Sequence, residues 1–336
     1  MSQQIHSQLH MNPSNPQNRA RNLFHRIGNE SPSIGRPGLE FDRVNNRIRG
    51  IIPELITEPA RFTKIMQDAY EMGHDHRTSR VAVRFFVPLP RTEEQNHAYQ
   101  GVMQGVLGFS GGKTGEYNNL LEGVVPFIHG QQRYGVVYAA MNKDERLSPF
   151  ATVEKERRAI ADMRARDTVQ HRPRNYEIRN ARMEDVEALT GLYDGVFSKY
   201  PVVLNASTIT NIVNGMPMVV AVSKKDGNIA SALAAEHVSF EVGGLGEINM
   251  IELSEAATHN AHRRRGLISV LAEHLVRSAR NELGEDGLVM YAEAVPSPAA
   301  TKAFLNANGR YGGTVHQQCV IRSDNMLQES KESQYG

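Results

Sequence analysis

The sequence predicts an α/β protein with two domains. Its 336 residues are about twice the roughly 150 that serve as a prior for one domain. In the second half, strand and helix periods follow one another in the order β-α-β-β-β-α-β-α-β, which is typical of a mixed central sheet flanked by helices. The first half shows a helix pattern at 58–72 and then the strand pattern Val81–Val87, so we expect a smaller, divergent α/β domain there.

Changes in composition divide the chain further. Residues 1–38 are rich in Ser, Asn, Gln, Pro and Arg and lack an apolar period, so we expect a disordered polar tail. Residues 39–148 form the predicted N-terminal domain, and the charged segment 149–174 has too few apolar positions for a core helix, which predicts a linker helix. The predicted C-terminal domain covers 175–325, and a flexible tail is expected at 326–336.

The elements of the C-terminal domain follow from local signals. A strand is expected at 176–179 and an amphipathic helix at 183–197. The strands 218–222 and 229–238 flank an Asp-Gly turn, which is a strong hairpin signal because the turn needs positive φ. A strand, a helix, a strand, a helix and a strand are then expected at 247–258, 263–283, 288–294, 298–308 and 314–322.

Charge and cysteine content disfavour several classes of protein. The chain has 38 Lys and Arg against 37 Asp and Glu, a net charge of +1, so we expect no nucleic-acid partner. The single cysteine, Cys319, can form neither an internal disulfide nor a cysteine-based zinc site, and we expect a cytoplasmic protein without a metal centre. No apolar run approaches the roughly 18 residues of a membrane helix, so no membrane association is expected.

A basic loop between a predicted strand and a predicted helix is the most informative stretch. It holds three consecutive arginines, 263–265, followed by Gly266. A helix N-terminus presents unpaired N–H groups and partial positive charge, and a glycine lets a phosphate approach the main chain. The loop therefore predicts a phosphate site, whereas an arginine run taken alone is more often a solvated helix start.

This loop resembles the coenzyme A loop of the GNAT N-acetyltransferases, in which Arg or Gln is followed by two residues, Gly, one residue, and Gly or Ala. Here the pattern is Arg263-x-x-Gly266-x-Ile268, and Ile268 departs from it. The resemblance implies a GNAT fold with acetyl-CoA as cosubstrate. The residues it implies for binding the coenzyme are Ala256, Ala257, Thr258, Arg263, Arg264, Arg265, Gly266, Leu267 and Ile268.

A closer resemblance, to the bacterial and archaeal β-lysine N-acetyltransferases, covers most of the chain after the tail. It depends on the order of five segments, 122–130, 176–179, 196–201, 252–258 and 311–313. That family also has a divergent N-terminal half, and it implies no metal. The resemblance implies N-acetylation of a primary amine of a small lysine-like amino acid, by direct attack in a ternary complex.

Two glutamates are candidates for the general base. A primary amine of pKa near 10.4 must lose a proton before it attacks a thioester. Glu252 ranks first because it lies eleven residues before Arg263, on the strand that runs beside the coenzyme in GNAT folds. Glu255 ranks second, because an unbroken strand would point it to the opposite face, whereas a bulge would bring both carboxylates to the amine.

Other groups are expected to serve the tetrahedral intermediate and the leaving thiolate. By resemblance, backbone N–H groups of 256–258 bind the oxyanion. Many GNAT proteins place a Tyr in the last helix to protonate the thiolate, but this chain has Leu305 there. Tyr311, with Tyr291 as an alternative, is our candidate, and solvent is an equal alternative because a thiol has a pKa near 8.5.

The sequence leaves the acceptor open. Between positions 176 and 324 there are 17 acidic and 13 basic residues, which favours a cationic small-molecule amine. A polyamine, an aminoglycoside or a protein amine is the alternative acceptor, and a non-catalytic coenzyme-binding or interaction protein is the alternative class. The N-terminal domain is expected either to shape the pocket or to form a dimer contact, so a homodimer is one possible assembly.

Overall fold

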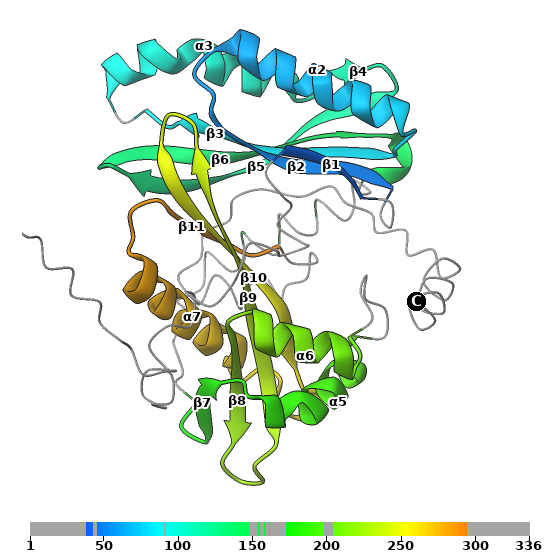
Figure 1. The fold of residues 1–336 in the computed structure, drawn as a ribbon, viewed down its shortest axis with the longest axis vertical. Coiled ribbons are helices and arrows are strands. Elements are labelled where there is room, and N and C mark those ends of the chain that lie inside the picture. Colours follow the sequence, from blue (N-terminus) through cyan, green and yellow to red (C-terminus); the bar gives the residue numbers. More distant parts are fainter. Residues whose placement is uncertain are drawn as a thin grey trace, which may run out of the picture.

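The structure, a computed structural model, contains two mixed sheets with helices packed on them (Figure 1). The residues it describes are 38–42, 46–90, 92–147, 154, 158, 161, 173–197 and 204–293. Both predicted tails except Gly38, most of the predicted linker helix, the last predicted helix and strand, Leu305, Tyr311 and Cys319 lie outside the described residues.

The N-terminal domain is a six-stranded sheet in the order β1-β2-β3-β6-β5-β4. Its strands are β1 (Gly38–Asp42), β2 (Arg47–Leu55), β3 (Arg80–Pro88), β4 (Lys113–Thr114), β5 (Tyr117–His129) and β6 (Gln132–Asn142). The helices are α2 (Pro59–Asp75) and α3 (Glu93–Phe109), with a 3₁₀ turn η1 (Asp144–Arg146) after β6. Strands β2 and β3 are parallel and joined through α2, and the other neighbours are antiparallel.

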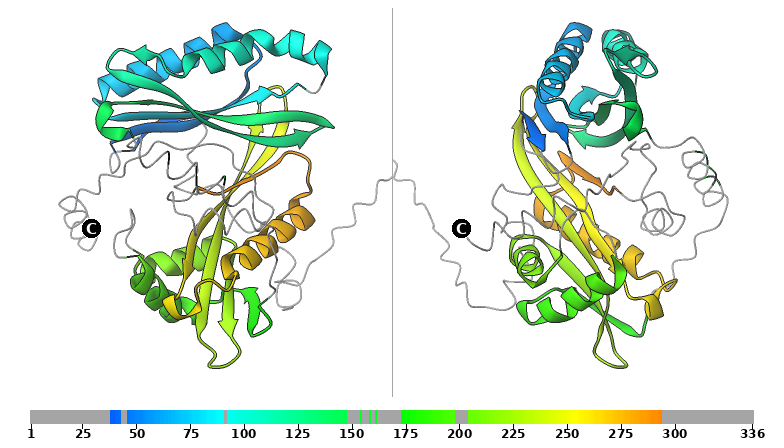
Figure 2. Two further views of the ribbon diagram at one scale, coloured as in Figure 1. Left: turned by 180° about the vertical axis from the view of Figure 1, so that it is seen from behind. Right: turned by 90° about the vertical axis from the view of Figure 1, so that its right-hand side faces the viewer.

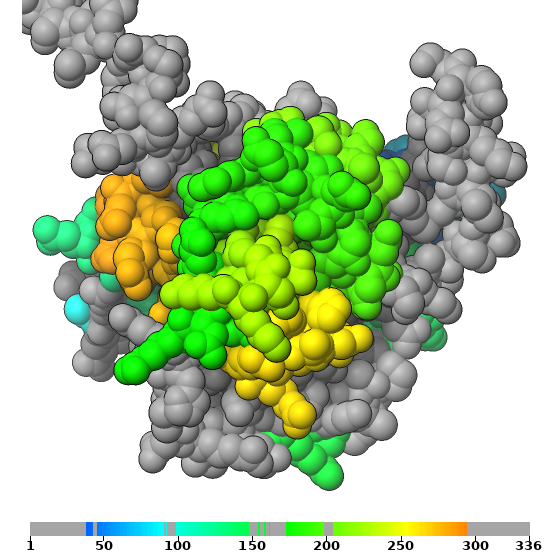
Figure 3. Space-filling model, turned by 90° about the horizontal axis from the view of Figure 1, so that it is seen from below, coloured from blue at the N-terminus to red at the C-terminus, as the bar shows by residue number. Residues whose placement is uncertain are grey.

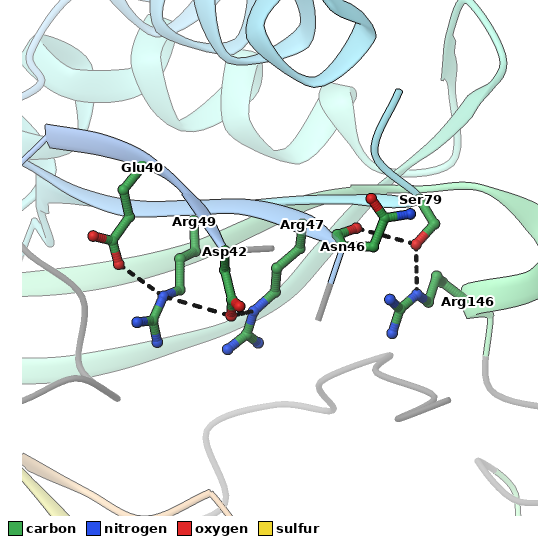
Figure 4. Close-up of polar contacts among 7 residues, drawn as sticks. All are labelled: Glu40, Asp42, Asn46, Arg47, Arg49, Ser79 and Arg146. Atoms are coloured by element: carbon green, nitrogen blue, oxygen red, sulfur yellow. Dashed lines mark hydrogen bonds and ion pairs between the residues drawn. The ribbon is translucent and has the colours of Figure 1, made fainter. Parts of the chain in front are cut away.

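The two faces of this sheet differ because strand residues alternate between them. On β3, Val81, Val83 and Phe85 pack beneath α2 and α3, whereas Arg84 and Phe86 point to the other face. Figure 4 shows that the end of this other face is polar, with side chains that project away from the helices and form ion pairs and hydrogen bonds among themselves. The helix-free face is therefore polar at one end and apolar at the other.

The C-terminal domain is a five-stranded sheet in the order β11-β10-β9-β8-β7. Its strands are β7 (Tyr176–Asn180), β8 (Met218–Ser223), β9 (Ile229–Val242), β10 (Gly246–Thr258) and β11 (Leu288–Tyr291). Its helices are α5 (Val186–Val196), α6 (Ala206–Gly215) and α7 (Leu267–Leu283), with 3₁₀ turns η2 (Met183–Asp185) and η3 (Asn260–His262). Helix α7 lies on one face of the sheet and α5 and α6 on the other (Figure 2), and their apolar side chains pack against it.

The predicted strands of this domain that fall within the described residues and the Asp-Gly hairpin are confirmed, but three predictions are corrected. Helix α6 was not predicted; β-branched residues with low helix propensity fill it, and it begins where Asn205 Oδ1 accepts a hydrogen bond from Thr208 N at 2.9 Å. Helix α7 begins at Leu267 rather than 263, because Arg264 and Gly266 have positive φ. Strand β11 ends at Tyr291 instead of 294.

A shared apolar core joins the two domains. The long hairpin of β9 and β10 extends from the C-terminal sheet to the N-terminal one (Figure 1), where Leu55 N donates to Gly243 O and Gly243 N to Pro53 O, both at 2.9 Å. Residues of both sheets form one buried cluster there, which includes Ile51, Phe86, Val136, Val238, Val242, Ile248, Met250 and Val289. The two sheets are thus packed together as two layers of one protein interior.

We expect Phe86→Ala to lower the free energy of unfolding by about 3–5 kcal/mol, because a large cavity would remain in this shared core. Phe86 is fully buried, and its ring centroid lies 6.0 Å from those of Phe127 and Phe240, one from each domain. Urea denaturation followed by circular dichroism would measure the loss. Leu107→Ala, at a position 58% exposed on α3, is the control, and a loss equal to that of the control would contradict the assignment of Phe86 to the core.

Candidate active site

Strand β10 connects the two parts of the candidate site. It pairs in parallel with β11 from Asn249 to Glu252, the last pair being Glu252 with Tyr291. β10 then continues to Thr258, whereas β11 ends, so among the described residues no strand pairs with this side of β10 after Glu252. Backbone groups along that edge are thereby left for a ligand.

A β-bulge lies between Glu252 and the end of the strand. The register of β9 and β10 shifts between Ser254 and Ala257, and Glu255 has a φ of 50°. Ala256 packs on the α7 side of the sheet and Ala257 on the α5 side. The bulge that the sequence left as an alternative is therefore present.

The bulge gives Glu255 different neighbours from Glu252. Tyr193 of α5 donates a hydrogen bond to Glu255 O at 2.7 Å, and the Glu255 carboxylate adds to the effect of burial in raising the pKa of the Tyr193 phenol. Glu252 instead faces the N-terminal sheet, on the same face of β10 as Met250 of the shared core. The structure thus associates Glu255 with the α5 side and Glu252 with the domain interface.

Glu252 is held by a chain of hydrogen bonds that crosses between the domains. Tyr291 Oη donates to Glu252 Oε2 at 2.9 Å, and Arg84 Nη1 donates to Tyr291 Oη at 2.9 Å. Arg84 Nη2 also donates to Glu293 Oε1 at 2.6 Å. Because Arg84 uses the lone pairs of Tyr291, the phenolic proton points to Glu252, which orients that carboxylate.

Burial raises the pKa of the Glu252 carboxyl to about 8. The nearby Glu293 carboxylate adds to the rise, whereas Arg84 opposes it, and Glu236, the cross-strand partner of Glu252 on β9, raises the pKa further. A carboxyl with this pKa can both take and return a proton near neutral pH. Its environment is typical of a catalytic acid or base.

Two residues of the N-terminal sheet that the sequence analysis missed lie at this site. Arg84 and Tyr138 are cross-strand neighbours on β3 and β6, and the Arg84 guanidinium lies 4.7 Å from the centre of the Tyr138 ring. The rings of Tyr138 and Tyr291 meet edge to face at 5.8 Å. The one available signal was Arg84 itself, the single charged residue within the apolar run Val81–Val87.

The basic loop lies at the opposite end of β10, at the surface seen in Figure 3. All three arginines, 263–265, are exposed, and Arg264 and Gly266 have φ values of 63° and 72°. The first hydrogen bond of α7 runs from Val270 N to Gly266 O at 3.2 Å, so the N–H groups before Val270 have no partner within the helix. Exposed N–H groups, the helix dipole and three cations fit a phosphate group.

The rest of the loop is fixed to the domain. Tyr176 Oη and His262 Nδ1 share a hydrogen bond of 2.8 Å, which ties η3 to β7. Burial lowers the pKa of His262, and the charge of Arg265 lowers it further, so this imidazole is neutral at pH 7. Leu267 is buried and Ile268 packs against the core beside α7. Thus the side chain that departs from the GNAT pattern contacts the core.

Within the part of the chain that is described, no group of three or more His, Cys, Asp or Glu side chains is arranged to hold a metal ion. No helix among the described residues is long and apolar enough to cross a membrane.

A strand that leads from a buried carboxyl to a basic loop and a helix N-terminus fits the site of an acyl-group transferase. Residues 177–297 match the model of a protein family described as the acetyltransferase (GNAT) domain. This part of the chain is therefore a GNAT domain, an acetyl-CoA-dependent N-acetyltransferase, and the mixed N-terminal sheet is a separate domain. The predicted fold class is confirmed.

Several solved acetyltransferases are similar to part of the chain. A Trypanosoma brucei acetyltransferase is 13% identical over 36% of this chain and 83% of its own, with a TM-score of 0.29. The ribosomal-protein-alanine N-acetyltransferase of Brucella melitensis is 17% identical over 38% and 86%, with a TM-score of 0.30. The aminoglycoside N-acetyltransferase AAC(6')-Iy is 16% identical over 43% and 95%, with a TM-score of 0.35. No curated protein matches the sequence significantly.

We expect Gly266→Ala to weaken acetyl-CoA binding at least tenfold, because the left-handed conformation costs a non-glycine residue about 1–2 kcal/mol and the main chain at the loop would change. Titration calorimetry with acetyl-CoA would measure the affinity. The control is Gly111→Ala, which alters a glycine with a φ of 87° in the turn between α3 and β4. Equal affinity of the two variants for the coenzyme would contradict a role of Gly266 in binding it.

Proposed function

We propose that the protein transfers acetyl from acetyl-CoA to a primary amine of a small lysine-like amino acid, with Glu252 as general base. The observation that carries this proposal is the buried Glu252 carboxyl of pKa about 8, held by Tyr291 on the strand that leads to the basic loop. The GNAT match of residues 177–297 supports the reaction type.

The loop residues 263–268 and the end of β10, Ala256 to Thr258, bind the coenzyme in this proposal. Glu252 takes a proton from the acceptor ammonium, and the amine nitrogen then forms a bond with the thioester carbonyl carbon. The N–H groups of the bulged strand stabilise the oxyanion. The C–S bond breaks, the amide nitrogen releases its second proton, and the leaving thiolate takes up one proton. That proton comes through solvent, or from Tyr291 or Tyr311, which the nitrogen's proton then restores. Glu252 finally loses its proton to solvent, which restores the base.

The charge at the site supports a cationic acceptor. Glu293 and Glu236 both raise the pKa of Glu252, whereas the basic side chain of Arg84 lowers it. An ammonium group bound beside these carboxylates lowers the pKa of Glu252, because opposite charges favour its ionised form. The base is thereby activated when the acceptor binds. β-Lysine, which the resemblance implies, carries such groups. A cytoplasmic location remains our expectation, with a homodimer as one possible assembly.

We expect the kcat/KM for the acceptor to rise with pH through about 8, because Glu252 accepts a proton only when ionised. A fall at higher pH is expected near 10.4, where a primary amine loses its proton. Glu252→Gln should lower kcat by about 10²–10⁴-fold and abolish the rise of kcat/KM near pH 8, with the affinity for acetyl-CoA unchanged. Thiol release measured from pH 6 to 10.5 would test both expectations.

Glu255→Gln and Glu241→Gln are the matched variants for this test. Glu241 is an exposed carboxylate on β9, and its loss should leave the profile unchanged. If Glu255→Gln abolishes the rise of kcat/KM near pH 8 and Glu252→Gln retains that rise, Glu255 is the base. A Glu252→Gln variant with normal turnover over the whole pH range removes Glu252 from the mechanism.

We expect β-lysine and lysine to be acetylated with a higher kcat/KM than polyamines, aminoglycosides or a lysine-containing peptide. The reason is that the Glu252 carboxyl is buried, with the Glu293 and Glu236 carboxylates near it, which favours a compact cation over a bulky one. A panel of these amines, followed by thiol release and by mass spectrometry of the product, would rank them. A preference for a peptide or an aminoglycoside contradicts the acceptor class, and acetyl-CoA binding without transfer to any amine would favour the non-catalytic alternative.

A further inference from the structure

Two buried hydroxyl groups beside Glu252 have no hydrogen-bond partner among the described residues. They are Tyr138 Oη, from the N-terminal sheet, and Ser254 Oγ, from β10. Ser254 lies two residues after Glu252, before the bulge, and so on the same face of the strand. Buried hydroxyl groups normally have partners, since an unpaired one costs free energy. Each of the two therefore offers a hydrogen bond to a polar ligand near Glu252.

Tyr138 is placed by contacts of its ring, and its hydroxyl lies near the Tyr291 phenol without meeting the geometry of a hydrogen bond. The residue is 7% exposed, Arg84 covers its ring at 4.7 Å, and Tyr291 meets its edge at 5.8 Å. The ring is thereby fixed, and the hydroxyl lies within the influence of the charges of Arg84, Glu293 and Glu252. Burial raises the pKa of this phenol, so it stays neutral at all pH values at which the enzyme works.

The contrast with Tyr117 shows that the sheet is able to pair such a group. Tyr117 is a fully buried tyrosine of the same sheet, on β5, and its Oη donates to Thr78 O at 2.7 Å. Tyr117 belongs to the core beneath the helices, whereas Tyr138 belongs to the core that the two domains share. The unpaired hydroxyl is thus found on the face that meets the GNAT domain.

We propose that the N-terminal sheet completes the acceptor site of the GNAT domain, with Tyr138 Oη accepting a hydrogen bond from the acceptor's ammonium group. A neutral phenol oxygen among carboxylates is suited to an N–H donor that carries positive charge. Arg84 is then a positioning residue, which holds Tyr138 through its ring and Glu252 through Tyr291. This inference depends on the proposed function, because it needs an amine acceptor beside Glu252.

The experiment compares Tyr138→Phe with Tyr117→Phe, each of which removes one oxygen atom from a buried ring. We expect Tyr138→Phe to raise the KM for the acceptor about tenfold, the effect of one hydrogen bond to a charged group, with kcat and the KM for acetyl-CoA within about twofold. Its thermal unfolding midpoint should equal or exceed that of the wild type, since no hydrogen bond is lost. Tyr117→Phe should lower the midpoint and leave the acceptor KM unchanged.

An acceptor KM for Tyr138→Phe within twofold of the wild type overturns the inference while acetyl transfer itself stands. A lower kcat with an unchanged KM also overturns it, because the hydroxyl would then act in the chemical step. An equal rise of KM in both variants overturns it too, by indicating a general effect on the sheet. A wild type that acetylates no amine overturns the proposed function first, and this inference with it.

Discussion

The hydrogen bond from Arg84 to Tyr291 joins the two domains chemically, and the hydrogen bond from Tyr291 to Glu252 extends that connection to the candidate base. Removing a carboxylate and a guanidinium from water is unfavourable, and their attraction compensates only when the remaining donors and acceptors are satisfied. Arg84 meets this condition through Tyr291, Glu293 and the ring of Tyr138. The position of the two sheets therefore controls the charge state of Glu252.

The geometry of β10 imposes a second constraint. Glu252 and Thr258 are six residues apart on one strand, a separation of roughly 20 Å in extended chain, shortened by the bulge. A ligand that reaches from the basic loop to Glu252 must accordingly be long and thin and must run along the strand edge. Strands β10 and β11 part at Glu252, so the strand that carries the base also carries the backbone groups beside such a ligand.

Local signals in the sequence account for much of the C-terminal fold. The Asp-Gly turn and the strand segments on either side of it indicate β8 and β9, and a strand followed by a basic loop, a glycine and an apolar helix pattern indicates β10 and α7. Helix α6 was missed because its residues have weak helix propensity, and burial of Ile209 and Ile212 stabilises it instead. Its formation depends on tertiary packing, which a local pattern does not contain.

In the candidate site, too, local sequence signals indicated some residues, whereas others depend on tertiary packing. The sequence indicated Glu252 and the loop, which lie on one continuous segment. It did not indicate Arg84 or Tyr138, because their contacts join distant parts of the chain: Arg84 and Tyr291 are 207 positions apart. Arg84 in an apolar strand was a visible anomaly, but only the packing of two sheets identifies its partners. Tyr138 had no signal at all, since a tyrosine in a half-buried strand is ordinary.

The groups that are costly for folding gather where the two domains meet. A carboxyl of raised pKa, a buried guanidinium and two unpaired hydroxyls lie beside an apolar cluster that would be more stable with hydrophobic residues in their place. The cluster around Phe86 supplies the burial that offsets this cost, and it also excludes water from Glu252. The N-terminal domain thus has two effects on Glu252. Its sheet helps to bury the carboxyl, and burial raises the pKa of the base. It also places Arg84 and Tyr138 beside the C-terminal sheet, where Arg84 opposes that rise.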